Sequence, residues 1–158
     1  MSDERKPLII TGRDELMEYA GKDLGTSDWV TVNQEDINTF AELTGDDQWI
    51  HVDEERAAEG PYGTTIQYGF LTLSKATGFL WEVCLVEGFD VILNYGLNKV
   101  RFPAPLKKGQ RYRMHSNLAE VNDIKGNGVE TIYKLTYEVE GEEKPCCVAD
   151  MVFRYYNN

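Results

Sequence analysis

The sequence predicts an α+β domain in which an antiparallel sheet wraps around one long buried helix. The segment 66–83 carries apolar residues at helical spacing and on nearly every side, as a buried helix does. From residue 91 onward, apolar and polar residues alternate with the period of two that half-buried strands show. Helical segments therefore come first and long strands follow, an order typical of α+β architecture.

The length and composition indicate one folded domain. A chain of 158 residues can bury one hydrophobic core and is too short for two comfortable domains. Hydrophobic residues make up 42% and charged residues 27%, the balance of an ordinary globular protein. We expect a single domain over residues 1–158, of which residues 1–24 form a less certain N-terminal extension.

The first third of the chain predicts a short helix, a strand and a second helix. Residues 12–22 form the first helix and residues 29–32 read as the strand. Asn33 is a suitable N-cap for the second helix, and Gly45 ends it in a left-handed conformation. The apolar stripe of this helix is Ile37, Phe40 and Ala41.

The middle of the chain predicts a short helix, a loop and the central helix. Asp53 caps a turn or two of helix over residues 53–58, and residues 60–63 form a loop. Gly69 and Gly78 lie inside the central helix at 66–83. Because glycine costs helical stability, these two positions indicate the close approach of another backbone.

The last part of the chain predicts long antiparallel strands, for a sheet of about five or six in all. The strands and the turns between them are 91–102, 111–118, 129–139 and 147–155, with turns at 122–128 and 140–143. Within the first of these strands the apolar phase slips from one parity to the other. A β-bulge near Asn98 accounts for the slip.

The three cysteines, Cys84, Cys146 and Cys147, do not form a disulfide framework, because their number is odd and two are adjacent. We expect reduced thiols and therefore the cytoplasm. No apolar stretch is long enough to span a membrane, and residues 1–6 lack the apolar core of a secretory signal. The net charge of −11 repels polyanions, so we expect no nucleic-acid partner.

The segment 44–51 places a carboxylate, an amide and an imidazole together after the end of a helix. Asp46 and His51 can act on a single water, one taking a proton while the other delivers one, as the addition of water to an activated double bond requires. The unperturbed pKa values of Asp and His, roughly 3.9 and 6.5, can be shifted by burial. Spacing alone leaves an alternative open: a loop histidine bonded to a helix C-terminus beside a capping aspartate.

The other polar residues are weaker candidates for a catalytic or metal-binding role. His115 shares the polar parity of its strand, so we expect it to face solvent. The two histidines and three scattered cysteines have no metal-ligand spacing, and we expect no metal. Ser74 is not flanked like a nucleophile elbow, which argues against serine hydrolysis.

Three segments carry a resemblance to a known family. The first reads Gly45-Asp46-x-Gln48-Trp49-Ile50-His51, and the second reads Tyr68-Gly69-Phe70-Leu71-Thr72-Leu73-Ser74. This pair resembles the signature of the MaoC-like dehydratases, the (R)-specific enoyl-CoA hydratase family. A later run, 94–105, resembles the nodulation-protein-N-like subgroup, and the resemblance covers roughly residues 25–156.

This resemblance implies a hot-dog fold and a homodimer or dimer of dimers whose sites borrow residues from the partner. It implies the reversible syn hydration of a trans-2-enoyl thioester to an (R)-3-hydroxyacyl thioester. The substrate would be an acyl-CoA or an acyl-carrier thioester. Coenzyme A would then enter only as part of the substrate, and no cofactor is implied.

The resemblance also assigns roles to residues. The catalytic pair falls on Asp46 and His51, and the serine that shapes the site falls on Ser74. The backbone amide that polarises the thioester carbonyl falls at or near Gly69. Tyr68 stands where the family often has a second histidine, and Gln48 stands where it has asparagine. Both are expected to contact substrate, and Tyr68 puts turnover of ordinary substrates in question.

Six basic residues fall within fifteen positions of this acidic chain: Lys99, Arg101, Lys107, Lys108, Arg111 and Arg113. They can form a docking patch for the phosphates of coenzyme A or for an acidic acyl carrier protein. They can equally be a solvated edge strand and turn. The overall function also has alternatives: a non-catalytic acyl-thioester-binding or regulatory protein, and, with less support, a thioesterase.

Overall fold

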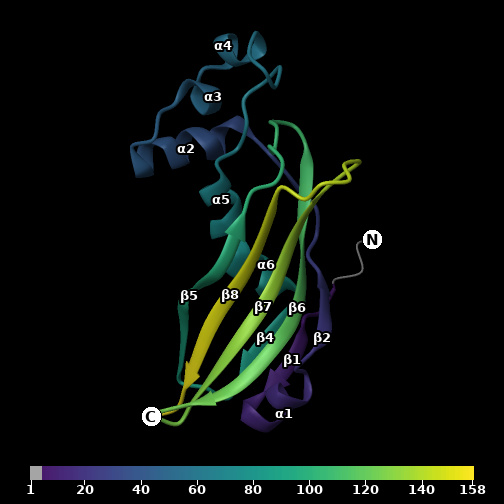
Figure 1. Cartoon of the computed structure of the whole chain (residues 1–158), viewed down its shortest axis with the longest axis vertical. Helices are drawn as coiled ribbons and strands as arrows, with labels where there is room; N and C mark the ends of the chain where they lie inside the picture. Colours follow the sequence, from purple (N-terminus) through teal and green to yellow (C-terminus); the bar gives the residue numbers. More distant parts are fainter. Residues whose placement is uncertain (1–4) are drawn as a thin grey trace.

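The computed structural model describes residues 5–158, and its main sheet is antiparallel throughout. The strands are β2 (Lys22–Thr26), β3 (Val30–Thr31), β5 (Val91–Arg101), β6 (Arg111–Ile124), β7 (Gly128–Val139) and β8 (Cys147–Tyr156). Their order is β2-β6-β7-β8-β5, and β3 also pairs with β6. The sheet curves across the helices α5 (Gly69–Ser74) and α6 (Ala76–Val83), as Figure 1 shows. The predicted α+β architecture is therefore confirmed.

The strands β6, β7 and β8 bury one face, as their period of two predicts. The buried side chains of this face include Tyr112, Met114, Leu118, Tyr133, Leu135, Tyr137, Ala149, Met151 and Phe153. The central helix packs onto it through Phe79, whose ring lies edge-on to Tyr112 and Tyr137 at centroid distances of 5.7 and 6.2 Å. Such aromatic contacts add to the burial of apolar area in holding helix and sheet together.

The bulge expected near Asn98 is present. The register between β5 and β8 shifts between Leu97 and Lys99, so Asn98 is the extra residue. A second shift, between Asn94 and Gly96, was not predicted. The extra residue Asn98 explains why the apolar pattern changes parity between Leu97 and Val100.

The central helix differs from the prediction in its start and its continuity. Residues 66–68 are not helical: the amides of Ile66 and Gln67 donate to the carbonyls of Ile50 and Leu106. The helix begins at Gly69 and is interrupted at Lys75, which separates α5 from α6. It is also not buried all round, since Phe70 is 71% exposed.

Two short strands, one near the N-terminus and one after the central helix, were not predicted from the sequence. β1 (Leu8–Thr11) and β4 (Cys84–Glu87) form a separate parallel pair. The helix expected at 12–22 is shorter: α1 spans Gly12–Glu18, because the chain from Lys22 onward pairs with β6. Residues 8–26 thus contribute to both sheets, and residues 1–4 of the expected extension lie outside the described part.

Three short helices form a helical cap, residues 34–58, at one end of the sheet (Figure 1). They are α2 (Gln34–Thr44), α3 (Trp49–Val52) and α4 (Glu54–Ala58). The predicted caps are confirmed: the Asn33 side chain accepts from the Asp36 amide at 2.8 Å, and Asp53 accepts from the Arg56 amide at 3.0 Å. Gly45 ends α2 with a φ of 78°, a left-handed conformation that favours glycine. Within residues 5–158, no helix is long and apolar enough to cross a bilayer.

Candidate active site

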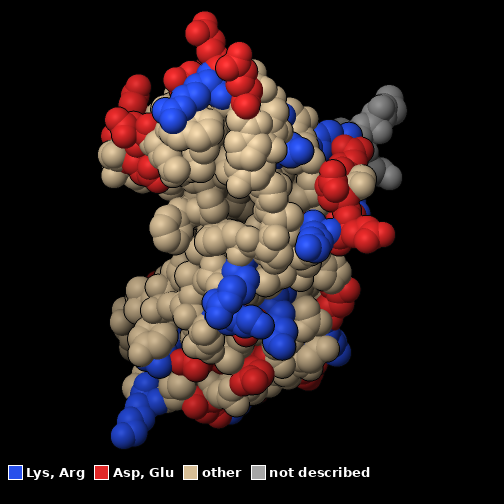
Figure 2. Space-filling view, turned by 45° about the horizontal axis from the view of Figure 1, so that its top comes forward, with Lys and Arg blue, Asp and Glu red and all other residues tan. Residues whose placement is uncertain are grey.

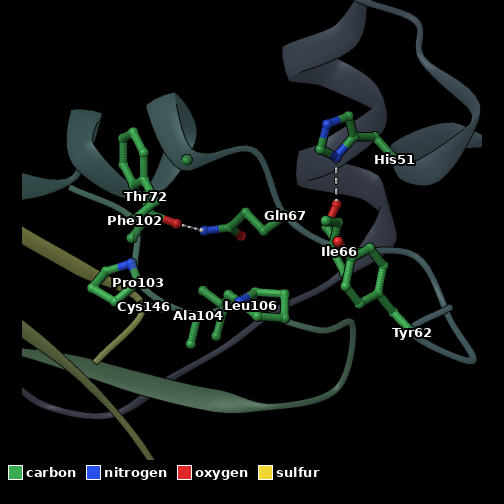
Figure 3. Close-up of a pocket in the computed structure, with 12 residues that line it drawn as sticks. His51, Tyr62, Ile66, Gln67, Thr72, Phe102, Pro103, Ala104, Leu106 and Cys146 are labelled. Atoms are coloured by element: carbon green, nitrogen blue, oxygen red, sulfur yellow. Dashed lines mark hydrogen bonds between the residues drawn. The ribbon is translucent and has the colours of Figure 1, made fainter. Parts of the chain in front are cut away.

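A cavity of about 380 Å³ lies between the helical cap and the sheet. Three segments line most of it: His51 on α3, residues 66–72 at the start of α5, and residues 102–106 after β5. Tyr62 and Cys146 complete the wall. Figure 2 shows the surface hollowed between the helical cap and the sheet, with mostly uncharged residues around the hollow. Figure 3 shows the lining residues.

The sequence placed His51 on a loop, but the structure places it on the short helix α3. It is buried, with 8% of its surface exposed. Its Nδ1 lies 2.7 Å from the Ile66 carbonyl oxygen (Figure 3). A carbonyl can only accept, so Nδ1 carries the hydrogen, and Nε2 of the neutral ring is left as a free base. The carbonyl of His51 in turn accepts from Gln34 Nε2 at 2.7 Å, which fixes the backbone of α3.

Tyr68 joins His51 to Asp46. Its ring stacks on the imidazole with a centroid distance of 3.8 Å and an interplanar angle of 25°. Its hydroxyl donates to the backbone carbonyl of Asp46. Burial raises the pKa of Tyr68, and the nearby carboxylates of Asp46 and Asp47 raise it further, so the phenol stays neutral and able to donate. Tyr68 does not line the cavity of the single chain. Its geometry supports the pair, and its contact with substrate stays a prediction.

Asp46 follows the C-cap of α2 and is exposed. One of its carboxylate oxygens accepts from the Gln48 amide at 3.3 Å, a turn that leads the chain into α3. Neither Asp46 nor Gln48 lines the cavity of the single chain. The structure therefore links Asp46 to the His51 ring through Tyr68 and leaves its carboxylate at the surface.

Gly69 and Ser74 lie at opposite ends of α5. A Cβ at Gly69 would come within 2.9 Å of the Phe102 ring, so any other residue at this position would force that ring to shift. Ser74 donates to the Leu71 carbonyl at 2.7 Å and faces a separate groove of about 230 Å³ beside β5. The structure thus brings Gly69 to the cavity with His51 and places Ser74 elsewhere.

Sequence reasoning missed Gln67 and Thr72, which both line the cavity. Gln67 is 6% exposed, and its side-chain nitrogen donates to Thr72 Oγ1 at 2.8 Å. The signal that would have revealed Gln67 is its position: an amide between Ile66 and Tyr68 in a run that is otherwise apolar.

The remaining polar candidates lie outside the cavity. His115 is bonded to Thr26 at 2.9 Å on the sheet surface, and its side chain is 43% exposed, close to the solvent-facing position expected. Of the six clustered basic residues, three form ion pairs: Lys108 with Glu54, Arg111 with Glu140 and Arg113 with Glu138. A docking role stays a prediction for the other three, Lys99, Arg101 and Lys107.

The cysteines are free and buried. Cys146 precedes β8 and reaches the cavity wall, and burial raises its pKa to about 12, so it stays a neutral thiol near pH 7. Within residues 5–158, no three His, Cys, Asp or Glu side chains are placed to share a metal ion.

Comparison with known proteins decides the family. The sequence profile of the MaoC like domain matches residues 16–140. The chain belongs to the MaoC-like dehydratase family. A relative from Mycobacterium tuberculosis (strain H37Rv), named 3-hydroxyacyl-thioester dehydratase Z, is 50% identical over 141 residues, 89% of this chain and 93% of that protein. Nodulation protein N of Rhizobium leguminosarum is 41% identical over 134 residues, 84% and 83% of the two chains.

Solved structures show the same fold. The monoamine oxidase regulatory protein of Archaeoglobus fulgidus superposes with a TM-score of 0.73 at 26% identity, over 88% of this chain and 91% of that one. The (R)-hydratase of A. caviae gives a TM-score of 0.69 at 16% identity, over 88% and 96%. The family, its nodulation-like relatives and the hot-dog fold are thereby confirmed. As a MaoC-like dehydratase, the chain is an enzyme.

Proposed function

We propose that this dehydratase interconverts a 3-hydroxyacyl thioester, in its (R) form, and a trans-2-enoyl thioester. One observation carries the proposal: His51 lines the cavity with Nδ1 bonded and Nε2 left free, while Tyr68 ties the same ring to Asp46. The name of the 50% identical relative, 3-hydroxyacyl-thioester dehydratase Z, supports the substrate class. Coenzyme A or an acyl carrier protein would bear the acyl group.

The chemistry needs one proton removed and one delivered at adjacent carbons. In hydration, the oxygen of water bonds to C3 as the dyad of Asp46 and His51 accepts a proton from that water. The dyad then returns a proton to C2, so that hydrogen and hydroxyl add to the same face. Dehydration is the reverse: C2 loses its proton to the dyad, and the hydroxyl leaves C3 as water. The fixed Nδ1 hydrogen bond of His51 keeps Nε2 free for the base role.

The thioester carbonyl gains negative charge in this reaction and needs a donor. The amides in the first turn of a helix have no partner within that helix. Gly69 is the first residue of α5 and lines the cavity with His51. We therefore assign its backbone N–H to the thioester oxygen, a role that a preorganised donor performs without reorganisation.

A dimer through β5, as a homodimer or within a dimer of dimers, belongs to the same proposal. β5 is an outer strand of the sheet, and its apolar side chains are 39–59% exposed at Val91, Leu93, Tyr95 and Leu97. An exposed apolar edge strand needs a cover. The groove that contains Ser74 is also lined by Leu97, so a partner on β5 would close it. Light scattering at micromolar concentration should show a dimer, and a monomer would remove this part of the proposal.

The purified protein should be mixed with short and medium trans-2-enoyl-CoA while the absorbance of the conjugated double bond is followed. Loss of that absorbance, with formation of the (R) but not the (S) product, is the expected result. The Asp46→Asn variant is the control for contaminating hydratases. Binding of acyl-CoA without turnover at any chain length would instead favour a non-catalytic thioester-binding protein, with Tyr68 as the first residue to examine.

A further inference from the structure

Gln67 lines the same cavity as His51, and the reaction scheme above gives it no role. It is 6% exposed and lies in the non-helical segment just before α5. In Figure 3 its amide nitrogen points toward Thr72 and its oxygen points away from Thr72. A primary amide buried to this degree needs partners for its two donors and for its acceptor.

The hydrogen-bond network fixes which end of the amide is which. The Thr72 hydroxyl donates to the Tyr68 carbonyl at 3.3 Å, so its oxygen can only accept from Gln67. The group of Gln67 that lies 2.8 Å from Thr72 Oγ1 is therefore the nitrogen. The same nitrogen lies 3.3 Å from the Tyr112 hydroxyl, and with these two contacts both of its hydrogens are used.

The amide oxygen of Gln67 has no such partner. Among residues 5–158, no donor reaches it, although the side chain lines the cavity. Phe102, Pro103 and Leu106 on the facing wall are apolar and offer no side-chain hydrogen bond. The oxygen is therefore an unpaired acceptor that is open to the cavity. A ligand that fills the cavity shuts this oxygen off from solvent, so a ligand without an O–H or N–H group at this point leaves it unpaired at a cost.

We infer that Gln67 determines specificity by accepting a hydrogen bond from the 3-hydroxyl of the bound thioester. The inference rests on the proposed function. His51 and Gln67 line the same cavity, so a thioester bound there can meet both side chains. The 3-hydroxyl has one hydrogen to donate to Gln67 and lone pairs to receive the proton with which it leaves as water. The enoyl thioester has no donor at C3, so Gln67 stabilises the hydroxyacyl form and the transition state but not the enoyl form.

This role predicts an unequal effect on the two directions of the reaction. Gln67→Met keeps the length of the side chain and removes the acceptor. For dehydration, KM should rise about tenfold with kcat unchanged, because ground state and transition state lose the same hydrogen bond. For hydration, kcat should fall by the same factor with KM unchanged. The equilibrium constant between the two thioesters requires that kcat/KM falls equally in both directions.

Two further variants serve as controls. Tyr112→Phe removes the longer of the two nitrogen contacts and leaves the amide oxygen in place, so both KM values should stay near those of the wild type. Thr72→Val removes the contact that orients the amide. It should raise KM for dehydration and lower kcat for hydration, each by less than Gln67→Met does. If Gln67→Met does not fold, Thr72→Val carries the same test.

A binding measurement separates this inference from the proposed function. In an Asp46→Asn background, which slows turnover, adding Gln67→Met should weaken the binding of 3-hydroxyacyl-CoA about tenfold and leave that of saturated acyl-CoA unchanged in calorimetric titration. Equal weakening of both ligands, or no weakening, overturns the role of Gln67. A wild-type protein that binds 3-hydroxyacyl-CoA without turning it over contradicts the proposed function, while the titration still tests Gln67.

Discussion

The sheet β6–β8 and the segment 46–68 belong to one domain but are held in place by different forces. In the sheet, large side chains such as Tyr133, Leu135 and Tyr137 are at most 1% exposed, and apolar burial contributes most of the stability. The segment 46–68 exposes Asp46 and depends on a few polar contacts between residues far apart in sequence.

This difference has a consequence for mutagenesis. Each hydrogen bond in the segment 46–68 contributes about 1 kcal/mol, a small part of the stability of a domain. The same bonds set the position of the reacting groups, on which the rate depends steeply. Substitutions in the sheet should therefore change stability and leave the chemistry intact, and substitutions in the segment should do the opposite.

The largest effect is expected for the dyad. Asp46→Asn and His51→Ala should each lower kcat by on the order of 10²–10⁴, with a smaller change in KM, because proton transfer is lost while the thioester contacts remain. Asp46 is exposed, so Asp46→Asn should leave the urea midpoint within experimental error of the wild type. Steady-state kinetics with enoyl-CoA, beside urea unfolding, measures both quantities.

Three comparisons test whether the pair works as a unit. The double variant should be little worse than the poorer single one. Ser74→Ala should cost less than either, because its hydroxyl bonds to the Leu71 carbonyl and lies outside the cavity with His51. His115→Ala should leave activity unchanged. Full activity in His51→Ala contradicts the dyad assignment, even though the fold is established.

The opposite outcome is expected in the sheet. Leu135→Ala, on the buried face of β7, should lower the free energy of unfolding by about 2–5 kcal/mol through lost burial and a residual cavity. Its kcat per folded molecule should match the wild type. Thr136→Ala, on the exposed face of the same strand, is the matched control and should change stability by less than about 0.5 kcal/mol. A large loss of kcat in Leu135→Ala would show that the two regions are coupled.

Tyr68→Phe tests the connection between Asp46 and His51. The variant keeps the ring that stacks on His51 and removes the hydroxyl that donates to the Asp46 carbonyl. We expect kcat to fall about tenfold and stability to fall by about 1 kcal/mol, the contribution of one hydrogen bond. Tyr68→Leu also removes the stack and should be slower still. An unchanged kcat in Tyr68→Phe would show that the Asp46 loop is positioned by other contacts.

The sequence predicts features that depend on local patterns better than features that depend on contacts between distant segments. The strands β6–β8 each bury one face, so a period of two revealed them, and the caps at Asn33 and Asp53 act within three residues. The parallel pair β1–β4 joins segments more than seventy residues apart, which no local pattern records. The interruption at Lys75 and the late start at Gly69 likewise depend on partners elsewhere, such as Ile50 and Leu106. In the site, the sequence was enough to name the motif residues Asp46 and His51. The role of Gln67 emerged only from its hydrogen bonds in the structure.

The smallest effect concerns the buried thiol of Cys84, which lies on β4 and belongs to the same hydrophobic core as Tyr133 and Leu135. Burial raises the pKa of Cys84 to about 11, above the roughly 8.5 of an exposed thiol. Between these values the unfolded chain binds fewer protons than the folded chain, so stability decreases as pH rises. The decrease from this thiol between pH 8 and 9.5 should be about 1 kcal/mol. Urea unfolding of wild type and Cys84→Ala at fixed protein concentration measures it. The variant starts less stable because packing is lost, but its stability should fall less steeply with pH, and equal slopes would contradict the assignment.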